Sequence, residues 1–359
     1  MVIEPGRRPG SAPARPATRT PVIDVHAHAL PMPLLRDLAA SGHADLAALP
    51  EGAITLDPRL SGLVGWSRIP VAPQQYDVAA RLVAMDATGV DAQLVSAPPF
   101  VFGSMCEDPG LVMDVTRRVN DALAEFVATA PDRLFALATV PIGHPEATAE
   151  LVRCLDRLGF AGAAIGSFGG GVELDDPRNE ELWGELSARR SFTLLHPSRA
   201  SAAERLASYY LVQLLGYPVE TALAASRLIL GGVLDRHGLV LCLAHGGGCV
   251  HGVGGRLNLG WRRKPVARTT PELPADYLSG LYYDTAVFNG TTLRRLIEDV
   301  TAGHVLLGTD MPFDLADEVP LQTVSELGLP AADAAAILGG NVQRLLSIDV
   351  EPVTRRLVG

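Results

Sequence analysis

Eight short apolar runs are the feature that most constrains the fold of this chain. They are rich in leucine and β-branched residues, show no polar alternation, and cover residues 22–28, 91–98, 134–141, 162–166, 192–196, 239–245, 281–286 and 304–310. Strands that are covered on both faces have this pattern. The runs therefore predict a buried sheet of parallel strands.

Helical patterns separate most of these runs. Residues 111–130 and 147–159 carry apolar side chains at three- and four-residue spacing, and they end near a proline or a glycine. Alternating strands and helices fit a closed (β/α)8 barrel or an open doubly wound sheet. No GxGxxG motif follows an early strand, and a barrel needs eight strands. We therefore expect an α/β fold, a distorted (β/α)8 TIM barrel.

Three segments stand apart from this alternation. Residues 1–20 mix Pro, Arg, Ala and Ser without a period, which predicts a flexible tail before a single domain over 21–350. Residues 40–76 follow the first strand without a clear period, and an insertion of that length indicates a lid. Residues 206–234 are apolar over most of their length, with only Glu220 and Arg227 charged, which predicts a helix buried either inside the monomer or against a second subunit.

Charge and hydropathy exclude two classes of partner. The chain has 40 acidic and 30 basic residues, a net charge of −10, which argues against binding to a nucleic-acid backbone. The longest uncharged run, between Arg236 and Arg256, contains histidines and many glycines and does not fit a membrane span. We expect a cytoplasmic protein without a membrane or nucleic-acid partner, in which an anionic substrate needs a local positive site.

Metal-competent side chains stand at the ends of four of the predicted strands. His26 and His28 are two residues apart on the first strand, so both project to one face. The runs at 192–196, 239–245 and 304–310 end at His196, His245 and Asp310. The C-terminal ends of barrel strands converge on the face that carries active sites. Imidazoles with a carboxylate suit Zn²⁺, with Mn²⁺, Fe²⁺ or Co²⁺ as alternatives.

These motifs resemble a known enzyme family. IDVHAH, LLHPS, CLAHGGG followed by Gly255-Arg256, YYDTAVFN and GTDMPF resemble, in this order, the amidohydrolase superfamily, and within it the aminocarboxymuconate-semialdehyde decarboxylase branch. The resemblance covers roughly residues 20–348. It implies one Zn²⁺ per subunit, bound by His26, His28, His196 and Asp310. The catalytic residues would be His245, which handles the proton of metal-bound water, and the ligand Asp310.

The resemblance also implies how a carboxylate substrate is bound. Arg68 in the insertion and Arg256 match two arginines that bind the substrate carboxylate. In the family's decarboxylase the second arginine comes from the neighbouring subunit, so a homodimer with Arg256 reaching the other active site is expected. Phe313, close to Asp310, is expected to line the pocket. Ser198 stands where close relatives carry tryptophan, which leaves the substrate open.

The expected activity is zinc-dependent, non-oxidative decarboxylation of a small unsaturated or aromatic carboxylic acid. The same mononuclear site also fits a hydrolase or hydratase that acts on a lactone, an amide or a C=C bond, because an activated water attacks either type of bond. A binding protein with an idle metal site is a third, less favoured alternative.

Overall fold

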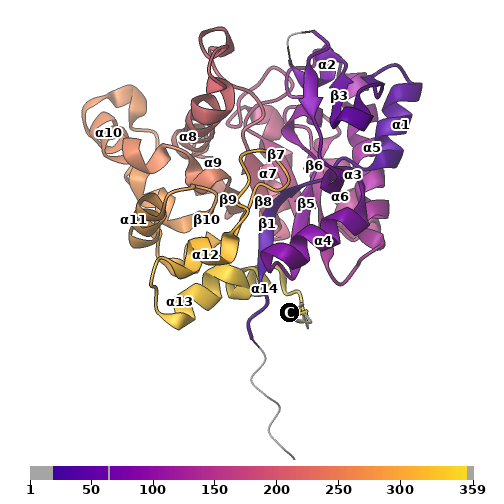
Figure 1. The fold of residues 1–359 in the computed structure, drawn as a ribbon. Coiled ribbons are helices and arrows are strands. Elements are labelled where there is room, and N and C mark those ends of the chain that lie inside the picture. Colours follow the sequence, from indigo (N-terminus) through magenta and orange to yellow (C-terminus); the bar gives the residue numbers. More distant parts are fainter. Residues whose placement is uncertain (1–18, 64, 354–359) are drawn as a thin grey trace, which may run out of the picture.

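A computed structural model describes residues 19–63 and 65–353. Parallel strands form one sheet in the order β1-β5-β6-β7-β8-β9-β10-β11, and helices surround it (Figure 1). The strands are β1 (Ile23–His28), β5 (Ala92–Ser96), β6 (Leu134–Val140), β7 (Gly162–Gly166), β8 (Phe192–His196), β9 (Val240–Leu243), β10 (Tyr282–Asp284) and β11 (Val305–Leu306). Each strand lies within one of the apolar runs, and every residue of β5, β7, β8 and β9 is buried. The predicted barrel is confirmed.

The barrel closes between β1 and the segment after β11. The Val25 N–H donates to the Leu307 carbonyl over 2.8 Å, and the Asp310 N–H donates to the His26 carbonyl over 2.8 Å. The run expected to form a strand over 304–310 is regular only at 305–306, and the chain turns through a positive φ of 62° at Asp310. This irregular seam distorts the barrel and brings Asp310 next to the histidines of β1.

The helices follow the periodic segments. They are α1 (Met32–Ala40), α4 (Val78–Thr88), α5 (Pro109–Ala128), α6 (Ala147–Arg157), α7 (Glu180–Ala188), α8 (Tyr217–Leu230), α9 (Val233–Arg236), α10 (Val250–Arg263), α11 (Gly290–Val300), α12 (Pro320–Ser325), α13 (Ala331–Ala335) and α14 (Asn341–Leu346). Asp108 caps the start of α5 by accepting the Leu111 N–H, and Asp77 caps α4 in the same way. Gly89, with φ +84°, ends α4 in the left-handed conformation that favours glycine.

The insertion after the first strand has a sheet of its own. The strands β2 (Ala44–Asp45), β3 (Ala53–Leu56) and β4 (Arg68–Pro70) pair antiparallel, apart from the barrel, and α2 (Pro58–Ser61) and α3 (Pro73–Tyr76) follow β3 and β4. Figure 1 shows α2 and β3 at the top of the molecule. An insertion after the first strand is therefore present, whereas its role as a lid over 40–76 stays a prediction. Its strands and helices are too short to give a sequence period.

Residues 206–234 are not one buried helix, and that part of the prediction is wrong. The chain passes through positive φ at Tyr209 and Tyr210, forms a π-helical turn over Val212–Gly216 and continues as α8. One face of α8 packs on the barrel. Other apolar side chains of the segment are exposed, namely Tyr209, Tyr210, Leu214, Leu215, Val219 and Leu223. The alternative that remains open is burial against a second subunit.

Two further expectations have a limited outcome. Residues 1–18 of the predicted tail lie outside the described residues, and the single domain over 21–350 stays a prediction. Among the described residues, no helix combines the length and the apolar character needed to cross a membrane.

Candidate metal centre

Four side chains with metal-binding atoms meet at the C-terminal end of the barrel. His26 and His28 come from β1, His196 ends β8, and Asp310 follows β11. All four residues are buried, and their ligand atoms lie within 4.8 Å of one another. The predicted ligand residues are therefore brought together from chain segments far apart in sequence.

The donor atoms face a common point. The two Nε2 atoms of His26 and His28 lie 3.1 Å apart, and Asp310 Oδ1 lies 3.2 Å from the first and 3.1 Å from the second. The His196 ring centroid lies 5.0 Å from the ring centroids of both other histidines. His196 Nε2 is buried and has no hydrogen-bond partner in the described part of the chain.

Hydrogen bonds at Nδ1 orient each of these imidazoles. His26 Nδ1 donates to Asp284 Oδ2 over 2.6 Å, His28 Nδ1 to the Ala97 carbonyl over 3.2 Å, and His196 Nδ1 to the Pro197 carbonyl over 2.8 Å. A proton at Nδ1 leaves the lone pair on Nε2, which is the atom that faces the cluster. This arrangement fits three imidazole ligands around one cation.

The electrostatics of the cluster also favour a bound cation. Burial lowers the pKa of His28, and burial together with the neighbouring histidines holds the pKa of His196 well below its usual range, so both are in the neutral form that binds metal. Burial opposes charge on His26 too, but Asp310 and Asp284 outweigh it and raise its pKa to about 10, so the two carboxylates favour a positive charge at Nε2, for which a proton and a metal ion compete. Burial likewise opposes charge on Asp310, but His26 and His245 hold its pKa well below its usual range.

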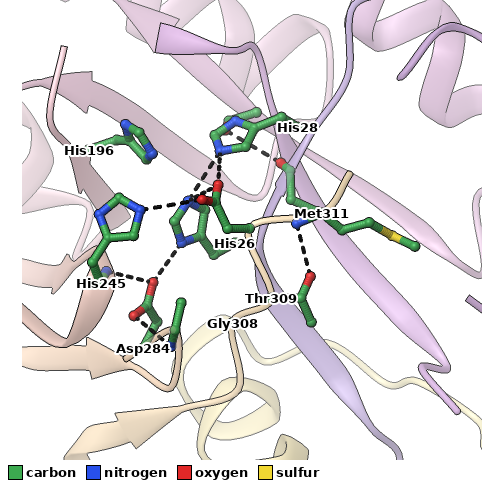
Figure 2. A network of polar contacts seen from close by, with 12 residues as sticks. His26, His28, His196, His245, Asp284, Gly308, Thr309 and Met311 are labelled. Atoms are coloured by element: carbon green, nitrogen blue, oxygen red, sulfur yellow. Dashed lines mark hydrogen bonds and ion pairs between the residues drawn. The ribbon is translucent and has the colours of Figure 1, made fainter. Parts of the chain in front are cut away.

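His245 stands beside this cluster, not within the ligand set. Its Nε2 lies 3.5 Å from Asp310 Oδ2, and its ring centroid lies 5.1 Å from that of His196. Figure 2 shows the His245 ring directed toward the other histidines, with Asp284 below it. Asp284, at the end of β10, accepts the backbone N–H groups of His245 and Gly246 over 3.0 and 2.8 Å. A single carboxylate therefore holds both a ligand imidazole and the backbone of His245.

The glycines after His245 let this loop pack closely against its neighbours. Gly247 and Gly248 have φ of +77° and +61°. A Cβ on Gly247 would lie 2.8 Å from the Tyr283 ring, and one on Gly248 would lie 2.1 Å from the Pro218 carbonyl oxygen at the start of α8. His245 itself has a positive φ of 57°. Non-glycine residues hold such a conformation only where the surrounding structure imposes it.

The other expected residues are placed unevenly. The Phe313 ring lies 4.9 Å from that of His28, at the edge of the metal cluster. Arg68 lies on β4 of the insertion, where it is largely exposed and pairs with Glu51 at 3.6 Å. Arg256 is an exposed residue of α10 on the outside of the barrel. Within the described part of the chain, neither arginine forms a hydrogen bond or ion pair with the four ligand residues, so their role in binding carboxylate stays a prediction.

Tyr217 is a neighbour of the cluster that the sequence did not single out. It is the first residue of α8, and its ring centroid lies 6.2 Å from that of His196. Burial and the nearby Asp310 carboxylate raise the pKa of this tyrosine to about 12. It lies in the apolar run 206–234. The pattern of that run predicts burial, but it does not indicate a polar group near a metal.

Comparison with known proteins agrees with this geometry. The family model described as Amidohydrolase matches residues 23–348. The 2-amino-3-carboxymuconate-6-semialdehyde decarboxylase of Dictyostelium discoideum is 32% identical over 76% of this chain and 77% of its own length. Gamma-resorcylate decarboxylase of Rhizobium sp. (strain MTP-10005) is 31% identical over 75% of this chain and 86% of its own length.

One similar protein of known structure contains a bound metal ion. The crystal structure of a dihydroxybenzoic acid decarboxylase from Polaromonas sp. JS666, with bound manganese and the inhibitor 2-nitroresorcinol, superposes with a TM-score of 0.72. It is 25% identical in sequence and matches over 91% of this chain and 97% of its own.

Proposed function

Because the chain belongs to the amidohydrolase family, we propose that it is a metal-dependent, non-oxidative decarboxylase of a small unsaturated or aromatic carboxylic acid. The observation that carries the proposal is the convergence of four buried ligand donors with His245 beside them. The names of the similar proteins support it, since they are decarboxylases of such acids.

The metal would be held by His26, His28, His196 and Asp310, one ion per subunit. The unpartnered Nε2 of His196 supports this assignment, because a buried nitrogen without a partner is costly. Three imidazoles and a carboxylate suit Zn²⁺, and the manganese of the Polaromonas protein makes Mn²⁺ the main alternative. When bound, such an ion acts as a Lewis acid and lowers the pKa of water.

His245 would carry the proton in the reaction. The two ring nitrogens of a histidine let it both accept and donate a proton in general acid–base catalysis. Its protonated form would donate to the conjugated carbon that bears the carboxylate. The bond from this carbon to the carboxylate carbon then breaks, carbon dioxide leaves, and the electron pair of that bond restores the conjugated system. Asp284 would keep His245 in place through its backbone N–H.

The substrate would lie between Phe313 and Tyr217, which flank the ligands His28 and His196. An aromatic ring packs favourably against such side chains. Arg68 and Arg256 would bind the carboxylate, since the planar guanidinium matches two carboxylate oxygens. Arg68 is in the insertion and would approach when the insertion moves over the site.

Arg256 would reach the active site of a second copy in a homodimer. It lies on α10, which packs against α8. Exposed apolar side chains on these helices include Val219, Leu223 and Leu259, and Leu215 in the π-helical turn before α8 is exposed too. Contiguous exposed apolar surface is typical of a protein interface. A partner that covers this surface would also bring its own Arg256 close to this subunit.

Trapping of released carbon dioxide tests the proposal. Protein loaded with Zn²⁺ or Mn²⁺ is incubated with γ-resorcylate, 5-carboxyvanillate and 2-amino-3-carboxymuconate semialdehyde. We expect release of carbon dioxide from at least one acid, its loss in His245→Asn and its retention in His304→Asn, a histidine hydrogen-bonded to Leu281 outside the cluster. A product that keeps every carbon would favour the hydrolase or hydratase alternative.

A further inference from the structure

A buried arginine lies behind the metal centre. Arg81 of α4 has no exposed surface, although arginine is rarely buried completely. Its guanidinium donates to the backbone carbonyl of the ligand His28, to Gln93 Oε1 over 2.8 Å and to the Gln74 carbonyl over 2.9 Å. A buried charge is costly unless its hydrogen bonds are made. The hydrogen bonds of Arg81 therefore hold its partners, among them the His28 carbonyl, in fixed positions.

Gln93 connects this arginine to a buried carboxylate. Gln93 Nε2, on β5, donates to Asp24 Oδ2 over 2.9 Å. Asp24 also accepts the Thr309 hydroxyl over 2.7 Å and the backbone N–H groups of His26 and Thr309 over 3.0 and 3.1 Å. The four residues Arg81, Gln93, Asp24 and Thr309 form one continuous chain of hydrogen bonds, which we call the clamp.

The clamp forms hydrogen bonds to the backbone of the ligand residues and makes none to their imidazole or carboxylate groups. Arg81 fixes the carbonyl of His28, and Asp24 fixes the N–H of His26. Thr309 directly precedes Asp310, and its hydroxyl accepts the Met311 N–H over 3.1 Å (Figure 2). The clamp therefore ties β1 to the irregular segment after β11, which pairs with β1 through a few backbone hydrogen bonds and an isolated bridge between Ala27 and Met311.

We propose that the clamp residues Arg81, Gln93, Asp24 and Thr309 are positioning residues that set the spacing of His26, His28 and Asp310 for the metal. This inference rests on the proposed metal site and adds to it residues that never touch the ion. His196 lies outside the clamp. Partners of metal ligands typically change metal affinity by about 10- to 100-fold when they are removed.

The alternative is that the clamp only stabilises the fold. A second buried hydrogen-bond network, away from the metal cluster, distinguishes this alternative from a positioning role. Asn120 of α5 also joins elements through buried hydrogen bonds, to the Thr139 backbone and to Glu150, outside the metal cluster. Thr139 itself is buried, and its hydroxyl has no hydrogen-bond partner within the described ranges. Asn120→Ala therefore controls for lost stability, and Thr139→Val controls for the change from threonine to valine.

The experiment measures Co²⁺ binding by competition with a chelator and the visible ligand-field spectrum of the Co²⁺ protein, together with the Tm of the metal-free protein. We expect Thr309→Val and Gln93→Met to weaken Co²⁺ binding at least about 10-fold and to alter the spectrum. Asn120→Ala should lower Tm while affinity and spectrum stay at the wild-type values, and Thr139→Val should change neither.

Wild-type affinity and spectrum in Thr309→Val would overturn the positioning role, as would an equal loss of affinity in Asn120→Ala at equal Tm. Wild-type protein that binds no Co²⁺ would instead refute the proposed metal site itself, so the two failures are distinguishable.

Discussion

Substitution of Gly248 by alanine should disrupt the loop that holds His245. The new Cβ would lie 2.1 Å from the Pro218 carbonyl oxygen and 2.7 Å from its carbon, both backbone atoms at the start of α8. Gly248 has φ +61° and ψ −121°, a sparsely populated backbone conformation that costs an L-residue about 1–3 kcal/mol, and overpacking adds about 1–3 kcal/mol. We expect a loss of about 2–6 kcal/mol in the free energy of unfolding.

Urea denaturation of the metal-free protein measures this loss, and Gly252→Ala is the matched control. Gly252 lies within α10, and a Cβ there meets no atom within 4 Å. Alanine should therefore stabilise this position by about 0.5–1 kcal/mol relative to glycine. Gly248→Ala should also lose carbon dioxide release, because the clash with Pro218 would displace the loop that holds His245. The reasoning would be refuted if the two variants were equally stable.

Three other perturbations have defined outcomes. His196→Ala should abolish metal-dependent stabilisation, which in the wild type amounts to about 2.7 kcal/mol at a free metal concentration of 100 times Kd; a Tm shift on metal addition that persists in the variant would contradict this. Leu215→Glu, on the exposed apolar surface, should convert the proposed homodimer to monomer in sedimentation velocity, and an unchanged sedimentation coefficient would argue against that interface. Glu180 pairs with Arg236 and His237, which lower its pKa to about 2. Its stabilising effect is present above its unfolded pKa and is lost as the pH falls from 4.5 toward about 2. Glu180→Gln should therefore cost at most about 1 kcal/mol at pH 7, because the pair is exposed, and less at pH 3; a difference that grows toward pH 3 would refute this assignment.

The barrel and the metal cluster could be predicted from the sequence because both depend on local patterns. Apolar runs mark the strands, and a histidine at the end of a run lies at the C-terminal edge of the sheet. The five candidates His26, His28, His196, His245 and Asp310 could therefore be grouped without knowing the helices between them. The choice of four ligands among them came from the resemblance to the amidohydrolase superfamily, and the structure brings those four together. The parallel topology does the rest, because it brings all strand ends to one face.

Other features depend on tertiary contacts that leave no local pattern. An apolar run such as 206–234 predicts burial but not the break at Tyr209 and Tyr210, where positive φ interrupts the helix. In the sequence, Arg81 looks like an ordinary polar residue of an amphipathic helix. Only the structure shows that it is buried and hydrogen-bonded to His28 on β1 and Gln93 on β5. From the sequence alone, Asp284 could equally have had a purely structural role. Only the structure shows its hydrogen bond with the His26 imidazole.

Anomalous diffraction from crystals of metal-loaded protein, recorded at the absorption edge of the metal, tests the central claim most directly. We expect one peak per subunit, within bonding distance of His26 Nε2, His28 Nε2, His196 Nε2 and an Asp310 carboxylate oxygen, with His245 outside the coordination sphere. A peak elsewhere, a second ion of equal height in the cluster, or coordination by His245 in place of His196 would contradict the assignment of this site.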